Sequence, residues 1–160
     1  MRWGAFVAAA PEIGALAAAR VAADRVVLVG TLRRDGSPRI TPVEAFVLGD
    51  ELMLGMMRRS KKALDLLDDP RLAVHSATAD PAGAEGDVKL YGRAVDVTDP
   101  ALRTAYGDVL EERIQWRPPE PFHLFAVDIE SAAFMRFGSE PLALRWTPNG
   151  GEVRLRHPDA

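Results

Sequence analysis

The sequence predicts an antiparallel β-barrel with a few appended helices. Six to eight short strands joined by tight turns can be recognised along the chain, against only two or three helices. The strands and helices do not alternate regularly, which argues against a doubly wound parallel sheet and favours a closed antiparallel one. The 160 residues contain no linker and no internal repeat, so we expect one domain over residues 1–160.

The N-terminal half is expected to hold the stretch around which the fold is organised, residues 26–77. Pro11 suits the first turn of an Ala-rich helix. Asp35-Gly36 and Gly49-Asp50 are turn sequences, because glycine accepts a positive φ at no steric cost. The expected elements, in order, are a helix at 11–23, strands at 26–32, 38–48 and 51–56, a helix at 63–69 stopped by Pro70, and a strand at 71–76.

The C-terminal half is expected to complete the barrel and to add a second long helix. Residues 88–97 alternate in polarity as a half-exposed strand does, and Pro100 opens a helix. Trp116 and three prolines predict a stiff, extended segment at 115–122. The expected elements, in order, are a loop at 78–87, a strand at 88–97, a helix at 101–113, a loop at 115–122, strands at 123–129 and 132–138, and a terminal hairpin of 142–146 and 153–156 around Asn149-Gly150-Gly151.

Composition and charge exclude several classes of protein. A net charge of −3 argues against a nucleic-acid partner. No apolar run approaches the roughly 18–20 residues of a membrane-spanning helix, and Pro11 and Glu12 interrupt the N-terminal stretch, so we expect neither a membrane partner nor a signal peptide. The absence of cysteine is compatible with a cytoplasmic location, which we expect. His75, His123 and His157 lack metal-ligand spacing, so no metal site is predicted.

The most basic run of the chain, residues 58–62, directly precedes the helix expected at 63–69. Ser60 is a good N-cap, since its hydroxyl can accept a hydrogen bond from a free backbone N–H. Arg58, Arg59, Lys61 and Lys62 are unfavourably placed beside the positive end of the helix dipole. A bound anion would remove this conflict, so the run indicates either a phosphate site or a solvated basic loop.

These elements, taken in order, resemble the pyridoxamine 5′-phosphate oxidase-like family of FMN-binding split barrels. The resemblance is carried by the Asp-Gly turn, Pro-Arg-Ile-Thr-Pro at 38–42, Leu-Met-Leu-Gly-Met at 52–56, Ser-Lys-Lys-Ala at 60–63 and Asp-Pro-Arg-Leu-Ala-Val at 69–74. It is good over residues 26–76 and looser to about residue 138. It implies a mainly β, antiparallel Greek-key split barrel. It also implies a homodimer that binds FMN, or in one branch the deazaflavin coenzyme F-420, between its subunits.

The resemblance also implies roles for individual residues. Arg39, Ile40, Thr41 and Pro42 would line the isoalloxazine ring, Gly55 and Met56 would approach the cofactor through backbone groups, and Ser60, Lys61 and Lys62 would hold the phosphate. Arg58 and Arg59 could serve the acidic tail of a deazaflavin, and Trp116 or Trp146 of the partner subunit could wall the substrate site. Members that oxidise the vitamin carry a lysine where this chain has Glu44, and the C-terminal Arg-x-His motif is found only out of context at 154–157, so a different small-molecule substrate is expected.

Two classes of function follow from the sequence. The first is a flavin (FMN)-dependent oxidoreductase acting on an unidentified small molecule, with an F-420-dependent reductase as the alternative cofactor choice. The second is a non-enzymatic dimeric module that binds flavin or haem, for which His75 or His123 would be the axial ligand. No residue is identified as the catalytic acid or base.

Overall fold

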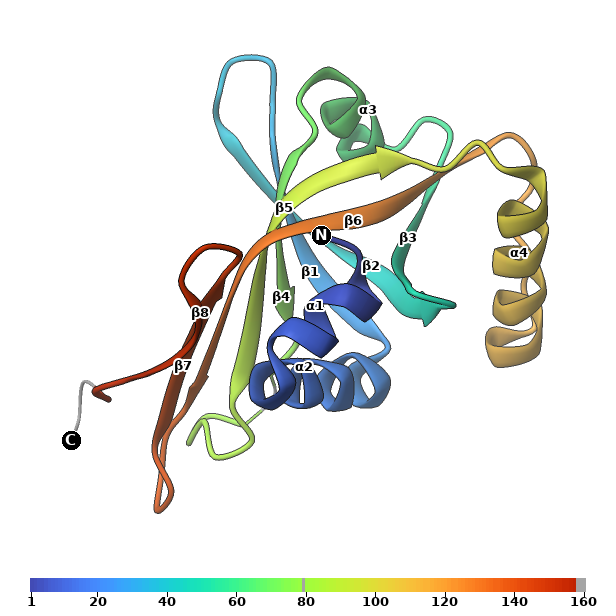
Figure 1. Ribbon diagram of the computed structural model, residues 1–160. Coiled ribbons are helices and arrows are strands. Elements are labelled where there is room, and N and C mark those ends of the chain that lie inside the picture. The colour runs from blue at the N-terminus through green and yellow to red at the C-terminus, as the bar shows by residue number, and fades with distance from the viewer. Residues whose placement is uncertain (79, 158–160) are drawn as a thin grey trace.

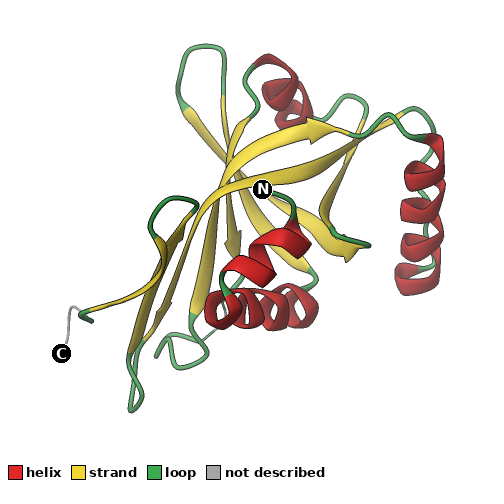
Figure 2. Ribbon diagram, viewed as in Figure 1, coloured by secondary structure: helices red, strands yellow, loops and turns green. Residues whose placement is uncertain are grey.

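The computed structural model describes residues 1–78 and 80–157, which form a twisted barrel with helices at its sides (Figures 1 and 2). Ala79, within the predicted loop at 78–87, lies outside the described residues. The helices are α1 (Trp3–Ala9), α2 (Pro11–Asp24), α3 (Lys61–Asp68) and α4 (Pro100–Ile114). The strands are β1 (Val26–Leu32), β2 (Pro38–Leu48), β3 (Glu51–Met57), β4 (Arg71–Ser76), β5 (Asp87–Asp96), β6 (Phe122–Arg136), β7 (Leu142–Thr147) and β8 (Gly151–Leu155).

The strands form one antiparallel sheet that closes on itself. Their order is β3-β2-β1-β4-β5-β6-β7-β8, and an additional pairing of β3 with β6 closes a six-stranded barrel. The chain makes a meander through β1, β2 and β3 and then returns to place β4 beside β1, which is the Greek-key order. The predicted mainly β, antiparallel Greek-key barrel is therefore confirmed.

The strand expected at 132–138 is wrong as a separate element, because β6 runs without interruption from Phe122 to Arg136. Its pairing with β5 shifts register between Tyr91 and Gly92. A bulge of this kind lets one strand bend and change partners without ending. The second half of β6 leaves the barrel and pairs with β7, so the terminal hairpin extends the same sheet.

The two N-terminal helices cover one side of the barrel (Figure 1). Helix α1 was not predicted. It has only seven residues, and its two buried residues, Trp3 and Phe6, are too few to show a helical periodicity. The Phe6 ring packs edge-to-face on Trp146, with the ring centroids 5.1 Å apart. Trp146 is fully buried there, so it belongs to the main core and the expectation that it walls a substrate site is wrong.

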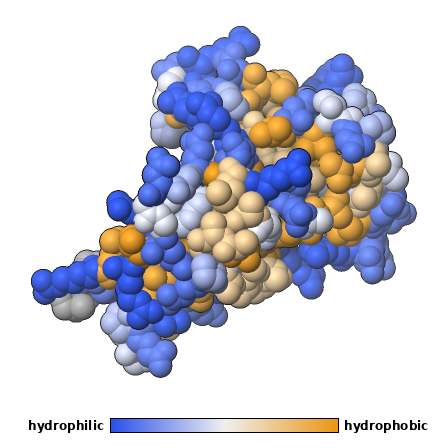
Figure 3. All heavy atoms as spheres, viewed as in Figure 1, coloured by the Kyte–Doolittle hydropathy of each residue, from blue (hydrophilic) through white to orange (hydrophobic). Residues whose placement is uncertain are grey.

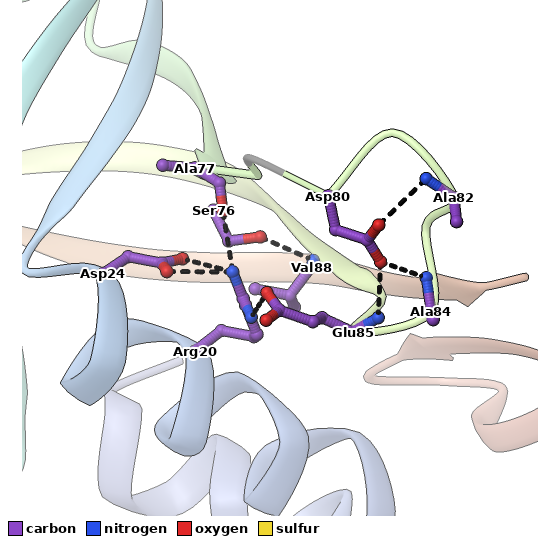
Figure 4. A network of polar contacts seen from close by, with 9 residues as sticks. All are labelled: Arg20, Asp24, Ser76, Ala77, Asp80, Ala82, Ala84, Glu85 and Val88. Carbon is purple, nitrogen blue, oxygen red and sulfur yellow. Dashed lines mark hydrogen bonds and ion pairs between the residues drawn. The ribbon is translucent and has the colours of Figure 1, made fainter.

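A polar network fastens the end of α2 to the connection between β4 and β5 (Figure 4). The Arg20 guanidinium donates to Asp24 at 2.8 Å, to Glu85 at 2.7 Å and to the Ala77 carbonyl oxygen at 2.9 Å. Asp80 accepts hydrogen bonds from the backbone N–H groups of residues 82, 84 and 85. These hydrogen bonds order the predicted loop and hold it against α2.

Helix α4 stands apart from α1 and α2, on the side of the barrel where β5 and β6 are connected (Figure 1). It packs through a second apolar cluster in which Tyr106 stacks on Phe46 at 4.7 Å and on Phe122 at 5.9 Å between ring centroids. Figure 3 shows apolar residues, in orange, on the molecular face between the N-terminal helices and α4. Within the described ranges, no helix combines the length and the apolar character that crossing a membrane requires.

Candidate functional site

The barrel opens where β2 and β3 separate. The two strands pair only from Leu48 opposite Glu51 to Ala45 opposite Leu54. Beyond that point β2 continues along β1, and β3 continues along β6. The gap between them is bordered by α3 and α4 and contains a cavity of about 250 Å³.

The cavity has mainly apolar and aromatic walls with a few polar groups, which is the usual composition of a small-molecule site. Its walls come from β2, β3, the start of α3, α4, the segment that follows α4 and the first residue of β6. The lining residues are Pro42, Val43, Glu44, Gly55, Met56, Met57, Ser60, Lys62, Tyr106, Leu110, Trp116, Pro118 and Phe122.

The start of α3 forms one polar end of the cavity. Ser60 occupies the N-cap position as expected, but its side chain makes no capping hydrogen bond, so that part of the prediction is wrong. Ser60 lines the cavity instead, which leaves its hydroxyl available to a ligand. The Lys62 ammonium donates one hydrogen bond, to the Pro42 carbonyl oxygen at 3.1 Å, and can donate two more. Burial lowers the pKa of Lys62, which shows that the ammonium is partly removed from water.

Arg39 lies away from this end and is engaged by α3 itself. Its Nε donates to Asp65 Oδ2 at 2.6 Å, and Thr31 Oγ1 donates to the same oxygen at 2.8 Å. Burial raises the pKa of Asp65, but the hydrogen bonds from Arg39 and Thr31 outweigh it and lower the pKa on balance. The positive charge of Arg39 is therefore already compensated within the chain.

The structure separates the nine predicted cofactor residues into groups. Those that line the cavity are Pro42, Gly55, Met56, Ser60 and Lys62. Arg39 and Ile40 instead border a shallow depression over β1 and β4, and Lys61 borders another beside Arg34. The Thr41 hydroxyl is buried without a hydrogen-bond partner among the described residues. Arg58 and Arg59 are exposed.

Tyr106 is a residue of the candidate site that the sequence did not single out. A Cβ at position 55 would lie only 2.1 Å from the Tyr106 hydroxyl oxygen, so the phenol lies directly against the Gly55 backbone. Burial, followed by the nearby negative charge of Glu44, raises the pKa of Tyr106, so the phenol stays protonated. The spacing of Leu102, Tyr106 and Leu110 along the predicted helix was a signal that could have placed this ring inward.

Trp116 also lines the cavity, from the same chain, and keeps 43% of its surface exposed. The candidate haem ligands lie elsewhere. The His75 Nδ1 contacts the Ser76 carbonyl oxygen at 2.6 Å, and the His123 Nε2 contacts the Arg58 carbonyl oxygen at 3.1 Å. Neither histidine lines the cavity.

Comparisons with known proteins agree with this architecture. The family model of pyridoxamine 5′-phosphate oxidase matches residues 14–136. A pyridoxamine 5′-phosphate oxidase-related, FMN-binding protein from Nostoc punctiforme PCC 73102 superimposes with a TM-score of 0.70 at 16% identity, covering 92% of this chain and 97% of that one. A search of curated proteins finds no match to this sequence.

Two further solved structures share the fold. A haem-binding protein from Mycobacterium smegmatis has a TM-score of 0.60 at 21% identity, covering 81% of this chain and 57% of that one. PhzG from Burkholderia lata 383, in complex with tetrahydrophenazine-1-carboxylic acid, has a TM-score of 0.62 at 16% identity, covering 89% of this chain and 88% of that one. At these identities the likeness concerns the fold. Given the family-model match over most of its length, the chain belongs to the pyridoxamine 5′-phosphate oxidase-like split-barrel family.

Proposed function

We propose that this protein is an FMN-dependent oxidoreductase acting on a small molecule. The observation that carries the proposal is the cavity where β2 and β3 separate, with Ser60 and Lys62 at one end and aromatic walls at the other. FMN joins an anionic phosphate to a flat apolar ring, and when bound it supplies the ring that takes up and returns electrons. The match to the family model and the FMN-binding structural neighbour support the choice of a flavin.

The phosphate would be held at the start of α3. The Lys62 ammonium, the Ser60 hydroxyl and the first backbone N–H groups of the helix are donors suited to an anion. The first turn of α3 contains no acidic residue that would repel it. Lys61 lies outside the cavity, so the proposal assigns the phosphate contact to Lys62 and gives Lys61 at most a weak, long-range attraction.

A homodimer would complete the site. The cavity of about 250 Å³ is slightly smaller than the roughly 300–1,000 Å³ of most ligand sites, so a second chain would enclose the rest of the cofactor. The outer face of β2, β1, β4 and β5 offers a surface for it, since Ile40, Gly30, Ala73 and Tyr91 form one row across these strands. Ile40 is 71% exposed and Tyr91 45% exposed, and burial of such apolar side chains drives association.

The dimer is tested by molar mass in solution. Ile40→Glu should convert the dimer to a monomer at micromolar concentration, because it replaces the most exposed apolar side chain of the row with a charge that the interface would have to bury. Leu64→Glu is the matched control, since Leu64 is an exposed leucine on α3, outside the row. A dimer that survives Ile40→Glu would contradict this choice of surface.

The cofactor is tested by the visible absorbance spectrum of the purified protein after incubation with FMN, F-420 or haem and then desalting. The proposal predicts that the bands of oxidised FMN stay with the protein. Retention of F-420 alone would identify the deazaflavin as the cofactor. The exposed Arg58 and Arg59 could then bind its acidic tail. A Soret band would favour a haem-binding module of the kind that the Mycobacterium smegmatis neighbour represents.

A further inference from the structure

Glu44 is a carboxylate in the cavity to which the proposed cofactor site gives no role. It is half-buried on β2 and makes no hydrogen bond or ion pair with any described residue. A partly desolvated carboxylate without a partner is costly, and structures usually supply one. A ligand that brings a positive charge or an N–H donor would supply it here.

The two charged side chains that line the cavity are held apart. Lys62 is fixed to the carbonyl group of Pro42, whereas Glu44 lies two residues further along the same strand. Residues 42 and 44 lie about 7 Å apart along the strand, and Lys62 and Glu44 form no ion pair with each other, so the two charges lie at separate points of the cavity. An anion and a cation can therefore be bound at the same time, each at its own end.

The surroundings of Glu44 suit an aromatic or other flat ligand. Tyr106, Phe122 and Trp116 line the cavity together with it, and Glu44 is close enough to Tyr106 to raise the pKa of the phenol. Aromatic faces attract cations as well as apolar rings, which adds to the attraction of a carboxylate for the same group.

We propose that Glu44 makes this cavity selective for a substrate that carries a cationic nitrogen on a ring-sized apolar body, and that it disfavours anionic substrates. The inference rests on the proposed function, since it takes the Lys62 end to be occupied by the cofactor phosphate. It adds the substrate class, which the cofactor alone does not determine.

The test uses three probes of similar shape and different charge: benzylammonium, benzyl alcohol and benzoate. Each is titrated against the protein loaded with FMN, and binding is followed by the change in flavin absorbance. The expected order of affinity is benzylammonium, then benzyl alcohol, then benzoate, with roughly a tenfold difference between the first two, which corresponds to about 1.4 kcal/mol.

Two variants separate the carboxylate from net charge. Glu44→Gln keeps the shape of the side chain and should make benzylammonium and benzyl alcohol bind equally. Glu112→Gln removes the same charge from the exposed surface of α4, outside the cavity, and should leave the tenfold preference intact. Equal binding of the three probes to the wild type, no binding of any of them, or an unchanged preference in Glu44→Gln would overturn the proposal.

The outcome is separable from that of the cofactor proposal. If the wild type retains no FMN, the same titrations are carried out on the cofactor-free protein and followed by the fluorescence of Trp116, with Trp116→Phe identifying its signal. A preference for benzylammonium that disappears in Glu44→Gln would then support the selectivity of the cavity even though the flavin assignment had failed.

Discussion

Gly55→Ala is the substitution with the most sharply defined structural consequence. Gly55 lies in β3 at the point where β2 departs, and its backbone faces the Tyr106 ring. An added Cβ would lie 2.1 Å from the Tyr106 hydroxyl oxygen and 2.5 Å from Cζ. Since real Cβ atoms do not approach other atoms this closely, the ring or the strand must move.

The cost can be worked out from the surroundings of the ring. Tyr106 is 1% exposed and is stacked on two phenylalanines, so any movement of the ring disturbs these contacts. Overpacking of this kind costs about 1–3 kcal/mol. We expect a loss of about 2 kcal/mol, which lowers the Tm of a chain of this length by roughly 4–8 °C.

The assay is urea unfolding of Gly55→Ala in two backgrounds, the wild type and Tyr106→Leu. In the second background the ring is gone, so the cost of the added methyl group should fall below about 0.5 kcal/mol. A harmless Gly55→Ala, or an equal cost in both backgrounds, would refute the proximity of Gly55 and Tyr106.

Three other outcomes are expected. Asp65→Asn should destabilise the protein by about 1–3 kcal/mol at pH 7, because the carboxylate accepts hydrogen bonds from two side chains. Since the pKa of Asp65 is lowered by folding, the difference from the wild type should shrink as the pH falls below the ordinary value of 3.8, and a constant difference in unfolding experiments between pH 7 and 3 would contradict this. Trp146→Ala should lower the free energy of unfolding, measured by thermal unfolding, by about 3–5 kcal/mol, because Trp146 is fully buried. Trp116→Ala should lower it by less than about 1.5 kcal/mol, because Trp116 is half-exposed, and equal losses in the two variants would contradict this difference in burial. Arg20→Ala should accelerate amide hydrogen exchange in residues 80–86 relative to the barrel strands, whereas unchanged protection would show that Glu85 and its neighbours do not depend on the arginine.

The strands were the most predictable part of the fold. The bounds of β1, β2 and β4 are those that the sequence predicts, because glycine turns and a proline mark their ends. The continuity of β6 was not predictable, since Glu130 and Ser131 interrupt the apolar pattern and only the β5 partner shows that they belong to a bulge. Closure of the barrel through β3 and β6 depends on a pairing between distant segments, which no local pattern specifies.

The sequence predicts where in the chain the candidate site lies, but not which side chains line it. Charge and helix position drew attention to residues 60–62, but adjacent residues of a helix point about 100° apart. Only the packing of α3 shows that Lys62 lines the cavity and Lys61 does not. Likewise, Arg39 has a compensating partner in Asp65 because α3 packs on β1, the neighbour of β2, although the two residues are 26 positions apart in the sequence.

The most direct test of the central claim is the Kd for FMN of Lys62→Gln and Lys61→Gln, measured by quenching of flavin fluorescence. Both variants remove one positive charge from neighbouring positions, but only Lys62 lines the cavity. A hydrogen bond to a charged group is worth about 1.5–3 kcal/mol, so Lys62→Gln should weaken binding roughly 10- to 100-fold. Lys61→Gln should change the Kd less than about threefold. Equal weakening by the two variants, or no effect of Lys62→Gln, would contradict the placement of the flavin phosphate at the start of α3.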